Sequence, residues 1–147
     1  MAQRDPESFF CLICEDVRLE VGQKLTLLGF TPGYTLNVQP GITNPQLNLS
    51  LVFVFNKGEG EFAGSFSLTG PNGIVGAELP VAHTHVGPDS SMASVFQFKP
   101  TPQIPLGQYL AKVTLNRRTY EQEIILRAGP GTVVAPGPEP ASATVKH

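Results

Sequence analysis

Apolar and polar residues alternate over much of this chain of 147 residues, and this pattern limits the secondary structure that the chain can form. It is clearest where Leu47, Leu49, Leu51, Phe53 and Phe55 occupy every second position. Successive side chains of a β-strand point to opposite faces, so this period of two predicts a strand with one buried face. Similar segments, separated by turn residues, recur from residue 8 to residue 127. No window has the sustained 3.6-residue period of an amphipathic helix.

The number and spacing of these segments predict the fold class. About eight to nine short strands at intervals of about ten residues are typical of a β-sandwich. We therefore expect an all-β, two-sheet, immunoglobulin-like β-sandwich, with a closed barrel as the alternative. The many glycines and prolines and the low share of charged residues (15%) also favour strands and turns.

One domain is expected, because the chain is too short for two ordinary ones. Residues 1–7 form an N-terminal extension, residues 8–127 the sandwich, and residues 128–147 a tail rich in Gly, Pro and Ala. The tail has too few anchoring residues to offset its ordering entropy, so it is predicted to be disordered.

Three local features of the sequence indicate how individual strands pack. A hairpin is predicted from about residue 17 to residue 30, with Gly22 and Gln23 as a two-residue turn. Pro80 predicts an edge or bulged strand. Val52 and Val54 make the outer face of their strand apolar, which suggests that a second copy of the protein covers it. The hairpin's apolar side chains are expected to face the core; they are Val17, Leu19, Val21, Leu25 and Leu27.

Charge and hydropathy exclude several partners. The net charge is −2 and the Lys and Arg residues are scattered, which is not the basic patch of a nucleic-acid-binding protein. The first eight residues lack the basic and apolar regions of a signal peptide. No apolar stretch approaches the roughly 20 residues needed to span a bilayer. We therefore expect a cytoplasmic protein that binds neither nucleic acid nor membrane.

The two cysteines, Cys11 and Cys14, have the C-x-x-C spacing of redox motifs. Their context is an apolar run of strand character rather than the N-terminus of a helix, where a thiolate would be stabilised. Residues three apart in a strand point to opposite faces, so the two sulfurs are not expected to meet. Both are predicted to be buried, unreactive thiols.

The first thirty residues also carry a family resemblance. The stretch Cys14-Glu15-Asp16-Val17-Arg18, followed by a return strand from Gly22 to Gly29, resembles a group of small, uncharacterised bacterial proteins. The later opening Pro105 to Tyr109 is similar to theirs as well. The resemblance implies a bacterial, cytoplasmic β-sandwich and carries over no catalytic residue.

The strongest candidate for a metal site is His83-Thr84-His85. Residues two apart in a strand share a face, so both imidazoles could bind one metal ion. A third ligand is missing, since Glu78 and Asp89 are only the nearest carboxylates in the sequence. Two exposed histidines of an edge strand are the simpler interpretation.

Catalytic chemistry is not predicted. Asp89, Ser90 and Ser91, next to the histidines, include the residue types of a Ser-His-Asp triad, but a polar Gly-Pro loop explains them as a turn. We therefore expect no enzyme activity and no cofactor.

Glu15, Asp16 and Arg18 form a charged cluster where the first strand ends. Asp16 and Arg18 share a face in an extended chain, so a carboxylate–guanidinium pair is one expectation. The cluster is either a recognition surface or a turn stabilised by charge. The sequence thus predicts a non-catalytic module that binds an unknown protein partner or a second copy of itself. A small-molecule or metal-binding protein that uses His83 and His85 is the alternative.

Overall fold

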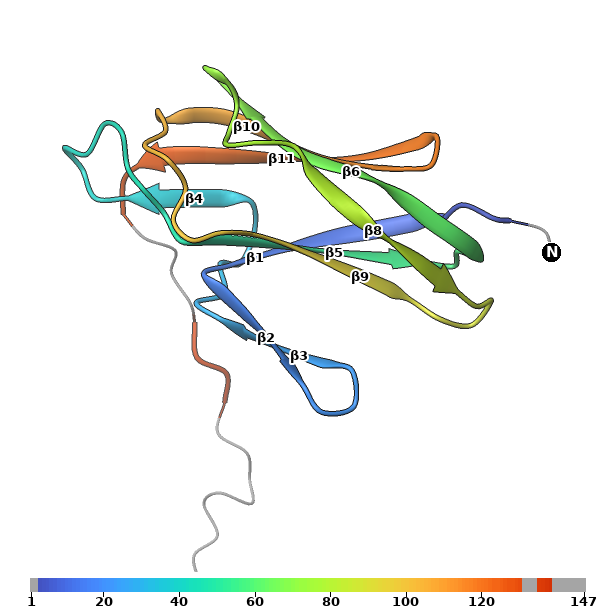
Figure 1. Cartoon of the computed structure of the whole chain (residues 1–147). Coiled ribbons are helices and arrows are strands. Elements are labelled where there is room, and N and C mark those ends of the chain that lie inside the picture. Colours follow the sequence, from blue (N-terminus) through green and yellow to red (C-terminus); the bar gives the residue numbers. More distant parts are fainter. Residues whose placement is uncertain (1–2, 131–134, 139–147) are drawn as a thin grey trace, which may run out of the picture.

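The computed structural model describes residues 3–130 and 135–138, and for residues 82–85 it describes the backbone but not the side chains. Within these residues the chain forms eleven strands in three open sheets and no helix (Figure 1). The strands are β1 (Ser8–Cys14), β2 (Asp16–Glu20), β3 (Lys24–Leu28), β4 (Thr35–Val38), β5 (Leu49–Asn56), β6 (Gly60–Gly70), β7 (Gly73–Ile74), β8 (Leu79–Val86), β9 (Met92–Phe98), β10 (Gly107–Leu115) and β11 (Arg118–Ala128). The all-β prediction is confirmed, although there are more strands than expected and the closed barrel is not formed.

The smaller of the two main sheets contains three antiparallel strands in the order β1-β5-β9. Its central strand, β5, is the segment with the clearest alternation, and Leu51, Phe53 and Phe55 are buried on its inner face. The other face of β5 is also covered, because Val52 is only 1% exposed within a single chain. A second copy is therefore not needed to bury Val52, contrary to the expectation from sequence.

The larger sheet has the order β4-β11-β10-β6-β7, and β8 also pairs with β6. All neighbours in it are antiparallel except β4 and β11, which run parallel. β8 carries Pro80 and pairs with β6 alone among the described strands, with a break in register between Phe62 and Gly64. The predicted edge strand with a bulge is thus confirmed.

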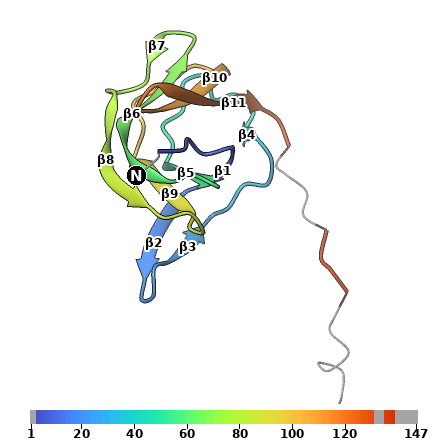
Figure 2. The same ribbon diagram turned by 90° about the vertical axis from the view of Figure 1, so that its right-hand side faces the viewer.

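The hydrophobic core lies between these two sheets. Figure 2 shows β10 and β11 on one side and β1, β5 and β9 on the other. The rings of Phe66 on β6 and Phe96 on β9 are stacked with centroids 4.1 Å apart, and Phe53 meets Phe66 edge to face. These contacts join the two sheets, because β6 belongs to the larger sheet and β9 to the smaller one.

The N-terminal segment is fastened to the body although it precedes the first strand. Arg4 and Glu59 exchange two backbone hydrogen bonds, of 2.7 and 2.8 Å. The Tyr120 hydroxyl donates to the carbonyl oxygen of the buried Pro6 at 2.9 Å. At the other end, the expectation of a disordered tail stays a prediction, because most of residues 128–147 lie outside the described part of the chain.

β2 and β3 form a third sheet of their own, outside the smaller main sheet (Figures 1 and 2). We call residues 16–28, which comprise these strands and their turn, the arm. The hairpin prediction is confirmed, but the turn has three residues, since Glu20 pairs with Lys24. The expectation that its apolar side chains face the core is wrong, because none of them belongs to the core cluster and Leu19 and Val21 are exposed.

Candidate functional site

The arm leaves and rejoins the body at one point, the end of β1. The Glu15 N–H donates to the carbonyl oxygen of Leu28 at 2.9 Å, and the Thr31 N–H donates to that of Ile13 at 2.8 Å. These bonds hold the two ends of the arm side by side. The predicted cluster of Glu15, Asp16 and Arg18 therefore lies at the base of the arm.

A chain of polar contacts fastens this base to the outer face of β5 and β9. The Gln97 side-chain N–H groups donate to Asp16 Oδ1 and to Ser50 Oγ, both at 3.2 Å. The Ser50 hydroxyl in turn donates to the carbonyl oxygen of Glu15 at 3.2 Å. Lys99, just after β9, forms an ion pair with Asp16. The orientation of the arm relative to the body is thus set by side chains from three strands.

The charged environment of Asp16 shifts its acidity. The Lys99 ammonium group, together with hydrogen bonds from the Val17 N–H and the Gln97 side chain, lowers the pKa of the Asp16 carboxyl group. A carboxyl group whose pKa is lower in the folded state stabilises that state above its unfolded pKa. This stabilisation is lost as the pH falls through the folded pKa.

We therefore predict that Asp16→Asn weakens the acid sensitivity of the protein. From about pH 6 to about pH 3 the melting temperature of the wild type should fall further than that of Asp16→Asn, because only the wild type loses the Asp16–Lys99 contact. Differential scanning calorimetry across this range measures the difference. Asp89→Asn, in the loop between β8 and β9, is the matched control and should follow the wild type. If the melting temperatures of the wild type and Asp16→Asn fall equally as the pH is lowered, Asp16 does not contribute this pH-dependent stabilisation.

Arg18 is not the partner of Asp16. It is exposed, and no ion pair to it is found among the described residues. Farther along the same face of β2, the Glu20 carboxylate accepts a hydrogen bond of 2.8 Å from the Thr26 hydroxyl. The three residues of the predicted interaction cluster thus have different surroundings, and only Arg18 lies on the free part of the arm.

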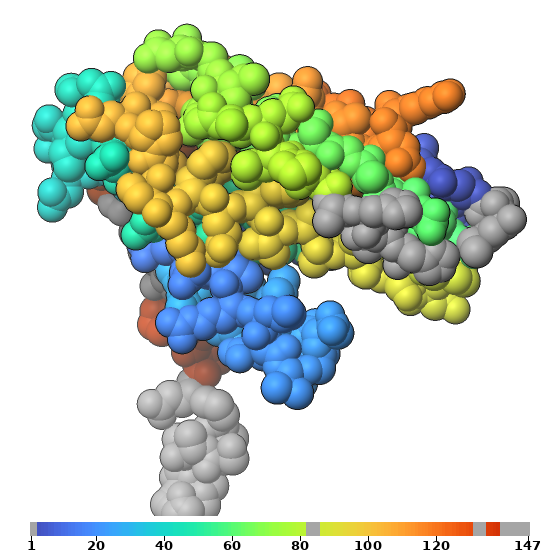
Figure 3. Space-filling view, viewed as in Figure 1, coloured from blue at the N-terminus to red at the C-terminus, as the bar shows by residue number. Residues whose placement is uncertain are grey.

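The outer part of the arm presents apolar side chains to solvent. Leu19 of β2 is 70% exposed, and Val21, the first residue of the turn that follows β2, is 96% exposed. Figure 3 shows the arm standing clear of the body below β9. Exposed apolar side chains close together on a projecting element form a candidate contact surface.

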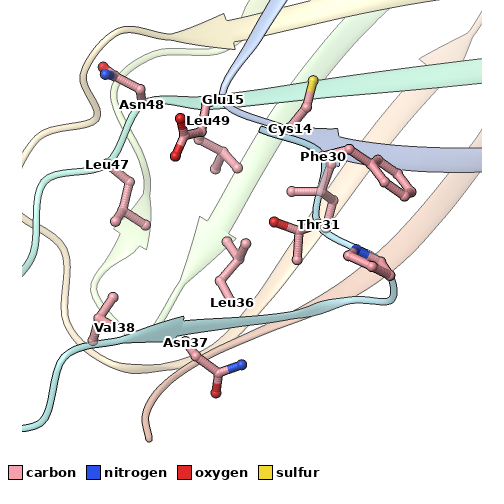
Figure 4. A pocket seen from close by; sticks show the side chains of 12 residues that line it. Cys14, Glu15, Phe30, Thr31, Leu36, Asn37, Val38, Leu47, Asn48 and Leu49 are labelled. Atoms are coloured by element: carbon pink, nitrogen blue, oxygen red, sulfur yellow. The ribbon is translucent and has the colours of Figure 1, made fainter. Parts of the chain in front are cut away.

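A cavity of about 330 Å³ adjoins the base of the arm. Its lining comes from the end of β1, the segment after β3, β4 and the start of β5 (Figure 4). Leu36, Leu47 and Leu49 supply apolar walls, whereas the Glu15 carboxylate is turned toward the hollow. Such a combination suits an apolar group with a positively charged end.

A glycine in the segment after β3 allows Glu15 to lie in this position. Gly29 has φ of +67°, and a Cβ atom there would come within 2.7 Å of the Glu15 side chain. The absence of a side chain at Gly29 therefore lets the Glu15 stem cross the backbone beside the cavity.

The predicted histidines can be placed only by their backbone. His83 and His85 lie on β8, where His85 pairs with Glu61 of β6, but their side chains are outside what the structure describes. Among the residues with described side chains, no group of three or more His, Cys, Asp or Glu is arranged to hold a metal ion. The metal site stays a prediction.

The other candidate chemistry involves the thiols and the seryl hydroxyls. Cys11 belongs to the core and Cys14 lies opposite Ser50 on the other face, so the predicted separation of the two free thiols is confirmed. Burial raises the pKa of Cys11 to about 12 and also raises that of Cys14, which opposes formation of a thiolate. The Ser91 hydroxyl donates to Asn56 Oδ1 at 3.1 Å, and Ser90 closes a backbone turn onto Gly87.

The cavity and the exposure of Leu19 and Val21 were not predicted from the sequence. The only signal in the sequence was the charges of Arg18, Glu20 and Lys24, which are dense for so short a hairpin.

Comparisons with protein-family models, with curated proteins and with solved structures found no match. Among the described residues, no helix is long and apolar enough to cross a lipid bilayer.

Proposed function

We propose that this chain is a non-catalytic protein-binding module of the immunoglobulin-like sandwich type, and that it binds its partner through the arm. The observation that carries the proposal is the separate two-stranded sheet, β2-β3, which projects from the body with Leu19 and Val21 exposed. The bound element would be an extended protein segment added to the edge of this sheet.

Two features support the immunoglobulin-like part of the proposal. The two main sheets contribute their inner faces to one core, and strands distant in sequence are neighbours within each sheet, as in Greek-key folds. In addition, Tyr109 near the start of β10 donates its hydroxyl proton to the carbonyl oxygen of Pro105. This contact has the form of the tyrosine corner of immunoglobulin-like domains. In that scheme the arm is an insertion between the first strand, β1, and the edge strand β4.

The geometry of the arm supports a binding role. A two-stranded sheet is marginally stable by itself, and a further strand completes its hydrogen bonding. The contacts of Asp16 with Gln97 and Lys99 hold the arm in place before a partner arrives, which lowers the entropy cost of binding. The cavity beside the base offers a recess for an apolar side chain of the partner that ends in a cation.

The proposal predicts that polar substitutions on the arm abolish binding. Leu19→Asp/Val21→Asp places two carboxylates on the apolar contact surface, and we expect the bound partner to decrease by about tenfold or more. The measurement is quantitative mass spectrometry of proteins that co-purify with the tagged chain from cells that produce it. The same cells also produce a second copy of the chain with a different tag, so that self-association is detected as co-purification of this copy.

Ile74→Asp is the matched control, because Ile74 is an exposed apolar residue of β7, on the larger sheet and away from the arm. Its co-purifying proteins should equal those of the wild type. The proposal fails if no protein, including the second copy, co-purifies in near-stoichiometric amount. It also fails if the arm variant and the control retain the same partners.

A further inference from the structure

Neither long edge of the arm is paired with another of the described strands, and the β2 edge is the more exposed one, since Leu25, Thr26 and Leu27 of β3 are half-buried. β2 and β3 are the only members of their sheet among the described strands, so the side of β2 that faces away from β3 is unpaired. Arg18, Leu19 and Glu20 along it are all exposed. The unpaired peptide groups of such an edge are a template for another strand.

We propose that this edge pairs with the same edge of a second copy of the chain. The two β2 strands would run antiparallel, with Leu19 of one copy directly opposite Leu19 of the other, and would form a four-stranded sheet from two arms. This inference rests on the proposed function and names the partner. Such a two-fold interface requires a surface that is complementary to itself.

The sequence of the arm meets this requirement in one register. With Leu19 on the two-fold axis, the two Leu19 side chains share one face, and Val17 of each copy lies beside the end of the other copy's β2, where the turn begins at Val21. On the opposite face, Arg18 lies opposite Glu20 of the second copy, and the same pair occurs twice by symmetry. Directly opposite residues in antiparallel strands have Cβ atoms about 4.5–5.5 Å apart, which is within reach of an ion pair.

Neighbouring registers are excluded by charge or by the contacts of the base. A two-fold axis at Arg18 sets two guanidinium groups against each other, and an axis at Glu20 does the same with two carboxylates. An axis at Val17 would place Asp16 opposite Arg18, but Asp16 is already held against the body by Gln97 and Lys99. The axis at Leu19 uses the exposed outer part of β2.

Both charged groups of the proposed pair are available. The Thr26 hydroxyl binds Glu20 Oε2 from within the same arm, which orients the carboxylate and leaves room for further donors. Arg18 is exposed and has no ion pair among the described residues. Lys24 lies opposite Glu20 on β3, but no ion pair between them is found among the described residues. The second copy would supply an ion-pair partner for each group.

Charge reversal tests the register directly by sedimentation velocity over a series of protein concentrations. The wild-type chain should dimerise, whereas Arg18→Glu and Glu20→Arg alone should each raise the dimer dissociation constant by at least about tenfold, because each sets like charges opposite each other. An equimolar mixture of the two variants should regain the dimer, since every carboxylate then meets a guanidinium group. Restored association in the mixture would also show that both variants are folded, because an unfolded chain could not form the dimer.

Arg117→Glu, at the exposed β10–β11 turn, is the matched control and should dimerise like the wild type. The inference is overturned if the wild type is monomeric at all concentrations, or if the mixture associates no better than the single variants. In either case the proposed function would still hold if a different protein co-purified with the wild type and did not co-purify with Leu19→Asp/Val21→Asp. The absence of any such protein would remove both.

An introduced thiol gives an independent measure of the same geometry. Leu19→Cys should form an interchain disulfide under mild oxidation at least about tenfold faster than Ile125→Cys, because the two-fold axis brings the Leu19 positions together. Ile125 is an exposed apolar residue of β11, on the larger sheet. Cys11 and Cys14 are buried and do not compete. Equal rates for the two variants would contradict the pairing at Leu19.

Discussion

Phe53→Ala should lower the free energy of unfolding by about 3–5 kcal/mol, since truncation of a fully buried ring leaves a cavity as well as removing its contacts. Phe53 is 0% exposed on the central strand of the smaller sheet. Its ring lies 5.7 Å from that of Phe9 and 6.2 Å from those of Phe66 and Phe96, measured between centroids. Because Phe66 belongs to the larger sheet, the truncation would weaken the contact between the two sheets. Urea denaturation followed by circular dichroism measures the change.

Phe10→Ala is the control for this prediction. Phe10 is on the next strand, β1, but on the outer face and partly exposed. Truncation of Phe10 should lower the free energy of unfolding by about 1 kcal/mol or less, because its side chain buries less apolar surface. Equal losses for the two variants would show that the centre of the core is not at Phe53.

The second large effect is expected from a glycine rather than from the core. Gly64→Ala should lower the free energy of unfolding by about 3 kcal/mol or more, because the added methyl group has no space. A Cβ atom at Gly64 would lie 1.7 Å from the carbonyl oxygen of Thr114 on β10. The obstacle is backbone, which can move only if the pairing between β6 and β10 is disturbed.

Gly87→Ala tests whether this loss is specific to Gly64. The nearest atom to a Cβ at Gly87 is Ser90 Oγ at 3.8 Å, which is an ordinary contact. We expect the free energy of unfolding to change by about 0.5 kcal/mol or less there. Thermal denaturation of both variants provides the comparison. A Gly64→Ala protein as stable as the wild type would contradict the close approach of β6 and β10.

Most strands could be predicted from sequence because the alternation of side chains is a local property. The segment from Leu49 to Phe55 is apolar at every second position, and any strand with that pattern has one face suited to a core. Pro80 likewise indicated an edge strand, since it cannot donate a hydrogen bond to a neighbour. These predictions needed no knowledge of which strands would meet.

The position of the arm could not be predicted in this way. Alternation shows that Val17, Leu19 and Val21 share a face, but it does not show what covers that face. In the structure no part of the core covers Leu19 and Val21, because β2 and β3 separate from both main sheets. The charge pattern of Arg18 and Glu20 was visible in the sequence, but its exposure was not.

The candidate site depends on contacts between residues far apart in the chain. Asp16 meets Gln97 and Lys99, more than eighty residues later, and no local pattern specifies that contact. The sequence instead predicts an ion pair between Asp16 and Arg18, because these two residues share a face of the strand. The cavity likewise forms where β1, β4 and the start of β5 converge, and its polar residue, Glu15, is positioned by Gly29.

The all-β class, the position of most strands and the separation of the two cysteines onto opposite faces could all be predicted from the amino-acid sequence. Each of these follows from the two-residue period of a strand, which is set by backbone geometry within a few residues. The parallel pairing of β4 with β11, the projection of the arm and the ion pair at its base became visible only in the folded chain. These depend on which apolar faces bury each other when the sheets meet, and that choice is made by the whole chain at once.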